Sequence, residues 1–92
     1  MRSAEAEGLA VEVLGFLVEN EARIERFLGQ TGLAADELRH ATTEPGFLAG
    51  VLAYLAADEG LLLEFCNWSG AAPEMPLHAL AALEGRHHWN ST

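Results

Sequence analysis

Apolar residues recur three and four positions apart along most of this chain, with polar residues between them. From Glu5 to Val18 this spacing places the apolar side chains on one face of a helix. Asn20 follows as an N-cap residue type, and Glu21 stands where the helix dipole favours an anion. Gly32 offers a left-handed C-terminal stop. The pattern therefore predicts one helix over 5–18 and a second between Asn20 and Gly32.

A short third helix is expected over Ala35–Ala41. Its first turn holds the acids Asp36 and Glu37, and its last turn holds Arg39 and His40. Both placements suit the helix dipole, which favours anions at the N-terminus and cations at the C-terminus.

The second half of the chain predicts three more helices. The fourth begins among residues 43–45, and its wide apolar face indicates a central position. Asp58 caps the fifth helix, which runs towards Gly70, and Pro76 suits the first position of a sixth. Residues 85–92 lack the pattern, so we expect a flexible C-terminal tail there.

The two halves of the chain match each other at an offset of 38 positions without a gap. The match joins helix caps, helix stops and residues of the apolar faces. The pairs are Val13 with Val51, Leu14 with Leu52, Phe16 with Tyr54, Leu17 with Leu55, Asn20 with Asp58, Glu21 with Glu59, Ile24 with Leu62, Phe27 with Phe65, Thr31 with Ser69, Gly32 with Gly70, and His40 with His78. Two Leu-rich helices can also resemble each other by chance, which is the alternative explanation.

The pattern predicts an all-α fold, with a single domain over 1–84 formed by a compact bundle of five to six short helices. Its repeat units, about 9–42 and 47–84, are two tandem three-helix units. Neither has enough apolar surface to fold alone, so we expect them to pack face to face with pseudo-twofold symmetry.

The net charge of the chain excludes some classes of binding partner. The chain has 5 basic and 14 acidic residues and a net charge of −9, which opposes phosphate backbones and anionic membranes. Its single cysteine, Cys66, leaves no internal disulfide, and no apolar run has the length of about 20 residues that a spanning helix needs. These features predict a soluble, cytoplasmic protein with neither a nucleic-acid nor a membrane partner.

Four features of the sequence resemble those of a known bacterial family. They are Phe16-Leu17 before Asn20-Glu21, the Thr31-Gly32-Leu33 stop, the stretch from Phe47-Leu48 through Tyr54-Leu55, and Asp58-Glu59 leading to Phe65. This string resembles the domain of unknown function 3572 family, small soluble proteins found mainly in alphaproteobacteria. The resemblance covers about Leu9 to Ala72 and implies the fold, while no catalytic residue comes with it.

The chain departs from that family pattern at two places. The pattern has a proline after each cap, where this chain has Glu21 and Glu59. The tail segment Arg86-His87-His88-Trp89 also lies outside the resemblance.

Two acid–histidine pairs are the weak candidates for a metal site. Asp36 precedes His40 by four residues, and Glu74 precedes His78 by four, so each pair would share a helix face. A break at Pro76 would separate the second pair. The simpler interpretation places acids at helix starts and histidines near helix ends, and we expect no resident cofactor.

Residues 20–41 also resemble a helix-turn-helix, which would bind DNA through its second helix. That helix would start with Asp36 and Glu37, where a DNA-binding protein normally presents basic and amide residues. Asp36 and Glu37 therefore argue against DNA binding by this segment.

Trp68 and Trp89 are the candidate partner-binding residues, since Trp is enriched at interface centres. For Trp68, packing in the core is the more frequent outcome. The sequence therefore favours a non-enzymatic module that binds a protein partner or a second copy of itself as a homodimer. A metal-binding or enzymatic domain built on the acid–histidine pairs is the alternative.

Overall fold

The computed structural model describes the backbone of residues 1–90 and the side chains of residues 1–84 other than Pro45. This part of the chain is all-α and contains no strand, as the sequence predicts. Its elements are α1 (Ser3–Val18), α2 (Glu21–Thr31), the 3₁₀ turn η1 (Ala35–Glu37), α3 (Leu38–Ala41), α4 (Pro45–Ala56), α5 (Glu59–Ser69) and α6 (Glu74–Asn90).

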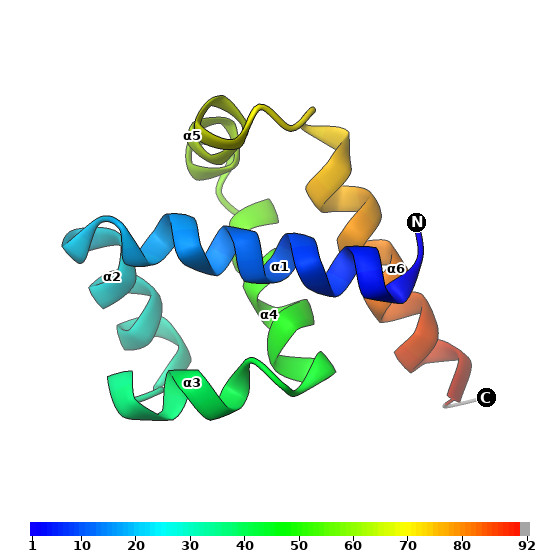
Figure 1. The fold of residues 1–92 in the computed structure, drawn as a ribbon, viewed down its shortest axis with the longest axis horizontal. Helices are drawn as coiled ribbons and strands as arrows, with labels where there is room; N and C mark the ends of the chain where they lie inside the picture. Colours follow the sequence, from blue (N-terminus) through cyan, green and yellow to red (C-terminus); the bar gives the residue numbers. More distant parts are fainter. Residues whose placement is uncertain (91–92) are drawn as a thin grey trace.

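Three helices form the centre of the bundle. α1 crosses in front of α4, and α6 packs against both of them (Figure 1). α2 turns back from the end of α1, and α5 lies on the other side of α1. Their apolar faces form one continuous core that includes Phe16, Leu17, Phe27, Val51, Leu52, Leu55, Phe65, Ala79 and Leu83.

The caps and stops of α2 and α5 lie where the sequence predicts them. The Asn20 side chain accepts a hydrogen bond from the Arg23 backbone N–H at 3.1 Å, and Asp58 accepts one from the Leu61 N–H at 3.1 Å. Gly32 and Gly70 end α2 and α5 in the left-handed region, with φ of 76° and 81°. A residue without a Cβ adopts this conformation at no steric cost.

The offset of 38 reappears in the helix boundaries. α2 and α5 begin and end 38 positions apart, and α1 and α4 end 38 positions apart, at Val18 and Ala56. Paired apolar residues share their burial as well, since Leu17, Leu55, Phe27 and Phe65 are all buried. The boundaries agree with two related units, and the twofold relation between whole units stays a prediction.

The third elements of the two units differ, against the expectation of two matching short helices. The first is split into η1 and the four residues of α3, whereas the second is the 17-residue α6. The hydroxyls of Thr42 and Thr43 donate to the carbonyls of Arg39 and His40, which satisfies the end of α3. Glu44 is then extended, the conformation that a residue before proline favours.

α6 begins and ends beyond its expected limits. It starts at Glu74, so the buried Pro76 lies inside its first turn rather than at its first position. The helix continues to Asn90, so the backbone of 85–90 is helical, and the flexibility expected of the tail stays a prediction. No proline follows Pro76, and each added residue contributes one more backbone hydrogen bond to a helix already formed.

Within the described chain, no single helix combines the length and apolar character needed to cross a membrane. The segments 46–56 and 59–69 reach those limits only when counted together, and they are bent by 106° at their junction.

Candidate functional site between α2 and α5

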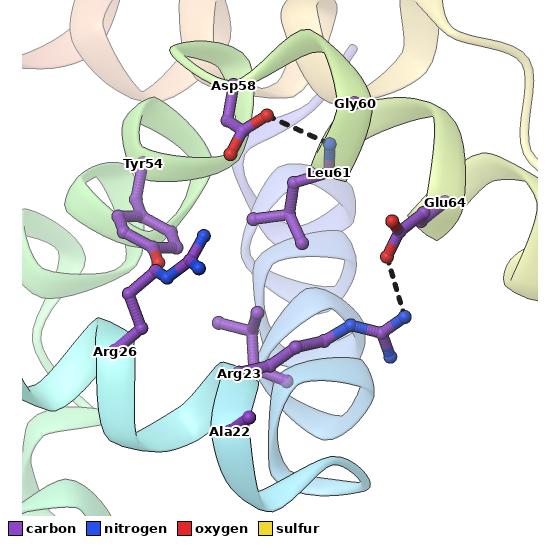
Figure 2. Close-up of a pocket in the computed structure, with 9 residues that line it drawn as sticks. Ala22, Arg23, Arg26, Tyr54, Asp58, Gly60, Leu61 and Glu64 are labelled. Atoms are coloured by element: carbon purple, nitrogen blue, oxygen red, sulfur yellow. Dashed lines mark hydrogen bonds and ion pairs between the residues drawn. The ribbon is translucent and has the colours of Figure 1, made fainter.

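A groove of about 280 Å³ lies between the first turns of α2 and α5, beside the end of α4 (Figure 2). A second depression adjoins it and shares Arg26, Tyr54, Asp58 and Gly60 with it. The groove is lined by Leu17, Ala22, Arg23, Arg26, Tyr54, Asp58, Gly60, Leu61 and Glu64.

Arg23 is fixed on one wall of the groove by two contacts. Its Nη2 lies 2.7 Å from Oε1 of Glu64, which joins α2 to α5 by an ion pair (Figure 2). Its guanidinium carbon also lies 4.3 Å from the centroid of the Phe16 ring, a cation–π distance. The ion pair reaches a residue 41 positions away on α5, and the ring contact joins α2 to the neighbouring α1, so Arg23 links α1, α2 and α5.

Arg26 and Tyr54 form the opposite wall. The Arg26 side chain extends towards Tyr54, whose ring packs edge-on against Phe27 with centroids 5.1 Å apart (Figure 2). Asp58 uses its carboxylate to cap α5, and Glu64 is paired with Arg23. The two carboxylates thus already have structural roles, and the lining combines them with two arginines. This arrangement suits recognition through charge and hydrogen bonds better than general acid–base catalysis, which needs a positioned group free to exchange a proton.

The groove lies where the two repeat units meet. Three of its lining pairs stand 38 positions apart: Ala22 with Gly60, Arg23 with Leu61, and Arg26 with Glu64. Sequence reasoning did not single out these residues. The available signal was a change of residue type at matched positions, since Arg23 matches Leu61 and Arg26 matches Glu64.

The acid–histidine pairs lie outside this groove. Asp36 and His40 are separated by the change from η1 to α3, while Glu74 and His78 share the first turns of α6, so Pro76 does not break their relation. All four side chains are exposed. Among the described residues no three His, Cys, Asp or Glu side chains come together as a metal site would require.

Cys66 lies on the buried face of α5. Burial raises the pKa of its thiol, and the negative charge of Glu74 raises it further. Both effects favour the protonated thiol, which is the unreactive form.

Trp68 is 44% exposed, against the more frequent outcome of core packing. One part of its ring contacts Phe16, with centroids 5.4 Å apart, and Phe65, with centroids 6.1 Å apart. The aromatic contacts hold the indole in place while much of it faces solvent. The side chain of Trp89 lies outside the described residues.

The segment that resembles a helix-turn-helix ends in η1 and the four residues of α3. Its acidic start, at Asp36 and Glu37, is exposed. A recognition helix enters the major groove with several side chains along its length, and this short element presents carboxylates there instead.

The helices, their caps and the shared groove define a small all-α protein built around one core. The chain belongs to the family described as Protein of unknown function (DUF3572), whose family model matches residues 3–86. The match extends beyond Leu9–Ala72, the expected range of the resemblance, and includes Arg86 of the tail. No curated protein and no solved structure matches the chain.

Proposed function

We propose that this protein is a non-enzymatic module that acts by binding another protein, with Trp68 as an anchor of the interface. The exposed indole of Trp68 is the observation that carries the proposal. Its contacts with Phe16 and Phe65 restrict the ring before any partner arrives. A side chain that is already ordered loses less conformational freedom on binding, which favours affinity.

The surroundings of Trp68 support the same function. Glu64 lies one helical turn before Trp68 on α5, and its partner Arg23 stacks on the Phe16 ring that Trp68 also touches. The indole therefore borders polar and charged groups whose positions are also fixed. Interfaces commonly place an aromatic anchor inside a polar rim of this kind.

The proposal can be tested by capture of partners from cells that naturally make the protein. Tagged wild-type protein is compared with Trp68→Ala, with Trp68→Phe, and with Leu63→Ala as the matched control. Leu63 lies on the same helix and is 52% exposed. We expect Trp68→Ala to lose a protein that the wild type and Leu63→Ala both retain, while circular dichroism confirms that each variant is folded.

A second measurement follows the fluorescence of Trp68 directly. In a Trp89→Phe background the indole fluorescence comes from Trp68 alone, because the chain has two Trp residues. Addition of the purified partner should shift the emission to shorter wavelength and protect the indole from iodide quenching. A concentration series of the protein by itself tests the homodimer in the same way. Unchanged emission and quenching in every complex would contradict the proposal.

A further inference from the structure

The outer side of α1 carries an apolar row that no other element covers. Ala4, Val11 and Val18 are seven residues apart, which is close to two helical turns, so they lie along one line. All three are exposed, Val11 by 47% and Val18 by 52%. In Figure 1, α1 lies in front of α4 and α6, so the side of α1 turned away from them faces the viewer.

A row of glycines runs beside this apolar row. Gly8 and Gly15 are also seven residues apart, and a Cβ added at either position would meet no atom within 4 Å. Glycine inside a helix costs about 1 kcal/mol relative to alanine. The described contacts of α1 do not require this cost, whereas a second helix could approach the backbone closely at both positions.

An acidic row follows the glycines along α1 and includes its C-cap residue. Glu5, Glu12 and Glu19 repeat the seven-residue spacing. Glu5 accepts a hydrogen bond from the backbone N–H of Arg2, while Glu12 and Glu19 form no ion pair with any residue that the structure describes. Residues 3–22 contain no Lys or Arg, so the acidic row has no basic residue within its own helix.

We propose that the outer face of α1, made of these three rows, binds a basic amphipathic helix of a partner protein. This proposal rests on the proposed function and names the chemistry of the partner. An apolar row on the partner would cover Ala4, Val11 and Val18, and its flanking Lys or Arg side chains would reach Glu12 and Glu19. Such a helix-in-groove contact uses anchors one and two turns apart.

Charge selects this occupant over a second copy of the chain. The net charge of −9 attracts a basic partner over a distance and repels another copy. Charge also favours this face over the groove between α2 and α5, because Arg23 and Arg26 there offset the carboxylates of Asp58 and Glu64. On this face, exposed apolar area lies beside two carboxylates that form no ion pair with the described residues.

The probe is a synthetic amphipathic peptide of about 18 residues, or five turns. Its apolar positions follow a heptad spacing, and Lys and Arg flank them. A matched peptide carries Glu at every Lys and Arg position. Binding of the labelled peptides to the full-length protein is followed by fluorescence anisotropy at low and at physiological salt. We expect the basic peptide to bind, more weakly as salt rises, and the acidic peptide not to bind.

Two pairs of variants separate a specific site from general attraction. Glu12→Gln with Glu19→Gln removes two charges from the outer face, and Glu25→Gln with Glu59→Gln removes two charges from α2 and α5. Val11→Ser removes apolar area from the face, and Leu63→Ser removes it from α5. These residues are all exposed, so the variants should keep the fold, which circular dichroism checks.

We expect each outer-face variant to lower the affinity for the basic peptide by about tenfold or more. Each control variant should change that affinity by less than about twofold. Equal weakening by both charge pairs would show general counter-charge binding and overturn the proposal. Absence of binding by the basic peptide, or equal binding of the acidic peptide, would also overturn it. None of these results involves Trp68, so the proposed function would still be decided by its own fluorescence test.

Discussion

The ring of Phe65 on α5 meets the ring of Phe16 on α1 edge-on, with centroids 5.5 Å apart and planes at 73°. The positions that match them at the offset of 38 are Phe27 and Tyr54, which meet in the same way at 5.1 Å and 81°. Each of the two predicted units thus places the aromatic residue of its second helix on the first helix of the other. Reciprocal contacts of this kind are what a twofold arrangement of the two units requires.

Double-mutant cycles should detect both aromatic pairs. Replacing Phe16 and Phe65 by Leu, singly and together, should give a coupling of about 0.5–1.5 kcal/mol in the free energy of unfolding. A cycle on Phe27 and Tyr54 should give a similar value. Phe16 with Phe27 serves as the control, because no ring contact joins them. Urea denaturation provides the measurement, and additive effects at both contacting pairs would contradict the exchange between units.

The two N-cap side chains should contribute similar amounts to the free energy of unfolding. Asn20→Ala and Asp58→Ala each remove a side-chain acceptor from a helix N-terminus and should lower the free energy of unfolding by about 1 kcal/mol. Asn67→Ala, at an exposed position of α5, should change it by less than about 0.5 kcal/mol. The urea midpoints of the three variants check this, and a loss at Asn67 as large as at the caps would refute it.

Replacing glycine by alanine should lower the free energy of unfolding at two sites and raise it at a third. Gly32→Ala and Gly70→Ala force a Cβ into the left-handed region, at φ of 76° and 81°, and should destabilise the protein by about 1–2 kcal/mol each. Gly29 lies inside α2 with no atom within 4 Å of its added Cβ, so Gly29→Ala should stabilise the helix by up to about 1 kcal/mol. Thermal unfolding measures all three. Destabilisation by Gly29→Ala would contradict the prediction, because it would show that the added Cβ meets other atoms.

Arg23 should contribute more to stability than its ion-pair partner. The pair with Glu64 is at the surface, so its coupling in a double-mutant cycle should be about 0.2–1 kcal/mol and should fall as salt rises. Arg23→Ala also removes the contact with Phe16, so it should cost more than Glu64→Ala by about 0.5–1 kcal/mol. Urea denaturation at low and high salt gives both values, and equal effects of the two single variants would exclude a contribution from the ring contact.

Cys66 should make stability depend on alkaline pH. Burial and Glu74 raise the pKa of the folded thiol above that of the unfolded chain, so its contribution is complete below the unfolded pKa, about 8.5. Above that pH the unfolded state releases the proton more readily, and stability falls until the pH passes the folded pKa. The free energy of unfolding of the wild type should therefore decrease relative to Cys66→Ala between neutral and alkaline pH. Parallel curves for the two proteins would contradict the raised pKa.

Local chemistry explains which parts of the fold the sequence could predict. Asn20, Asp58, Gly32 and Gly70 act on the few residues beside them, so their identity alone set the ends of α2 and α5. The periodic apolar positions likewise determined the buried faces. The length of α6 was harder to predict, because it depends on packing against α1 and α4 as well as on its own residues.

The candidate site depended on contacts that no local pattern contains. Arg23 and Glu64 are 41 positions apart, and each alone is an ordinary surface residue. Trp68 was recognised as a candidate anchor, but its exposure followed from how α5 lies against Phe16 on α1. The groove itself arises only when the two units come together.

The exchange of aromatic rings between units bears on how such a protein could arise. A lone copy of residues 9–42 would have Phe27 without the ring of Tyr54, and Phe16 without the ring of Phe65. Such a fragment could regain both ring contacts by pairing with a second copy of itself. Joining the two halves in one chain makes these contacts independent of protein concentration.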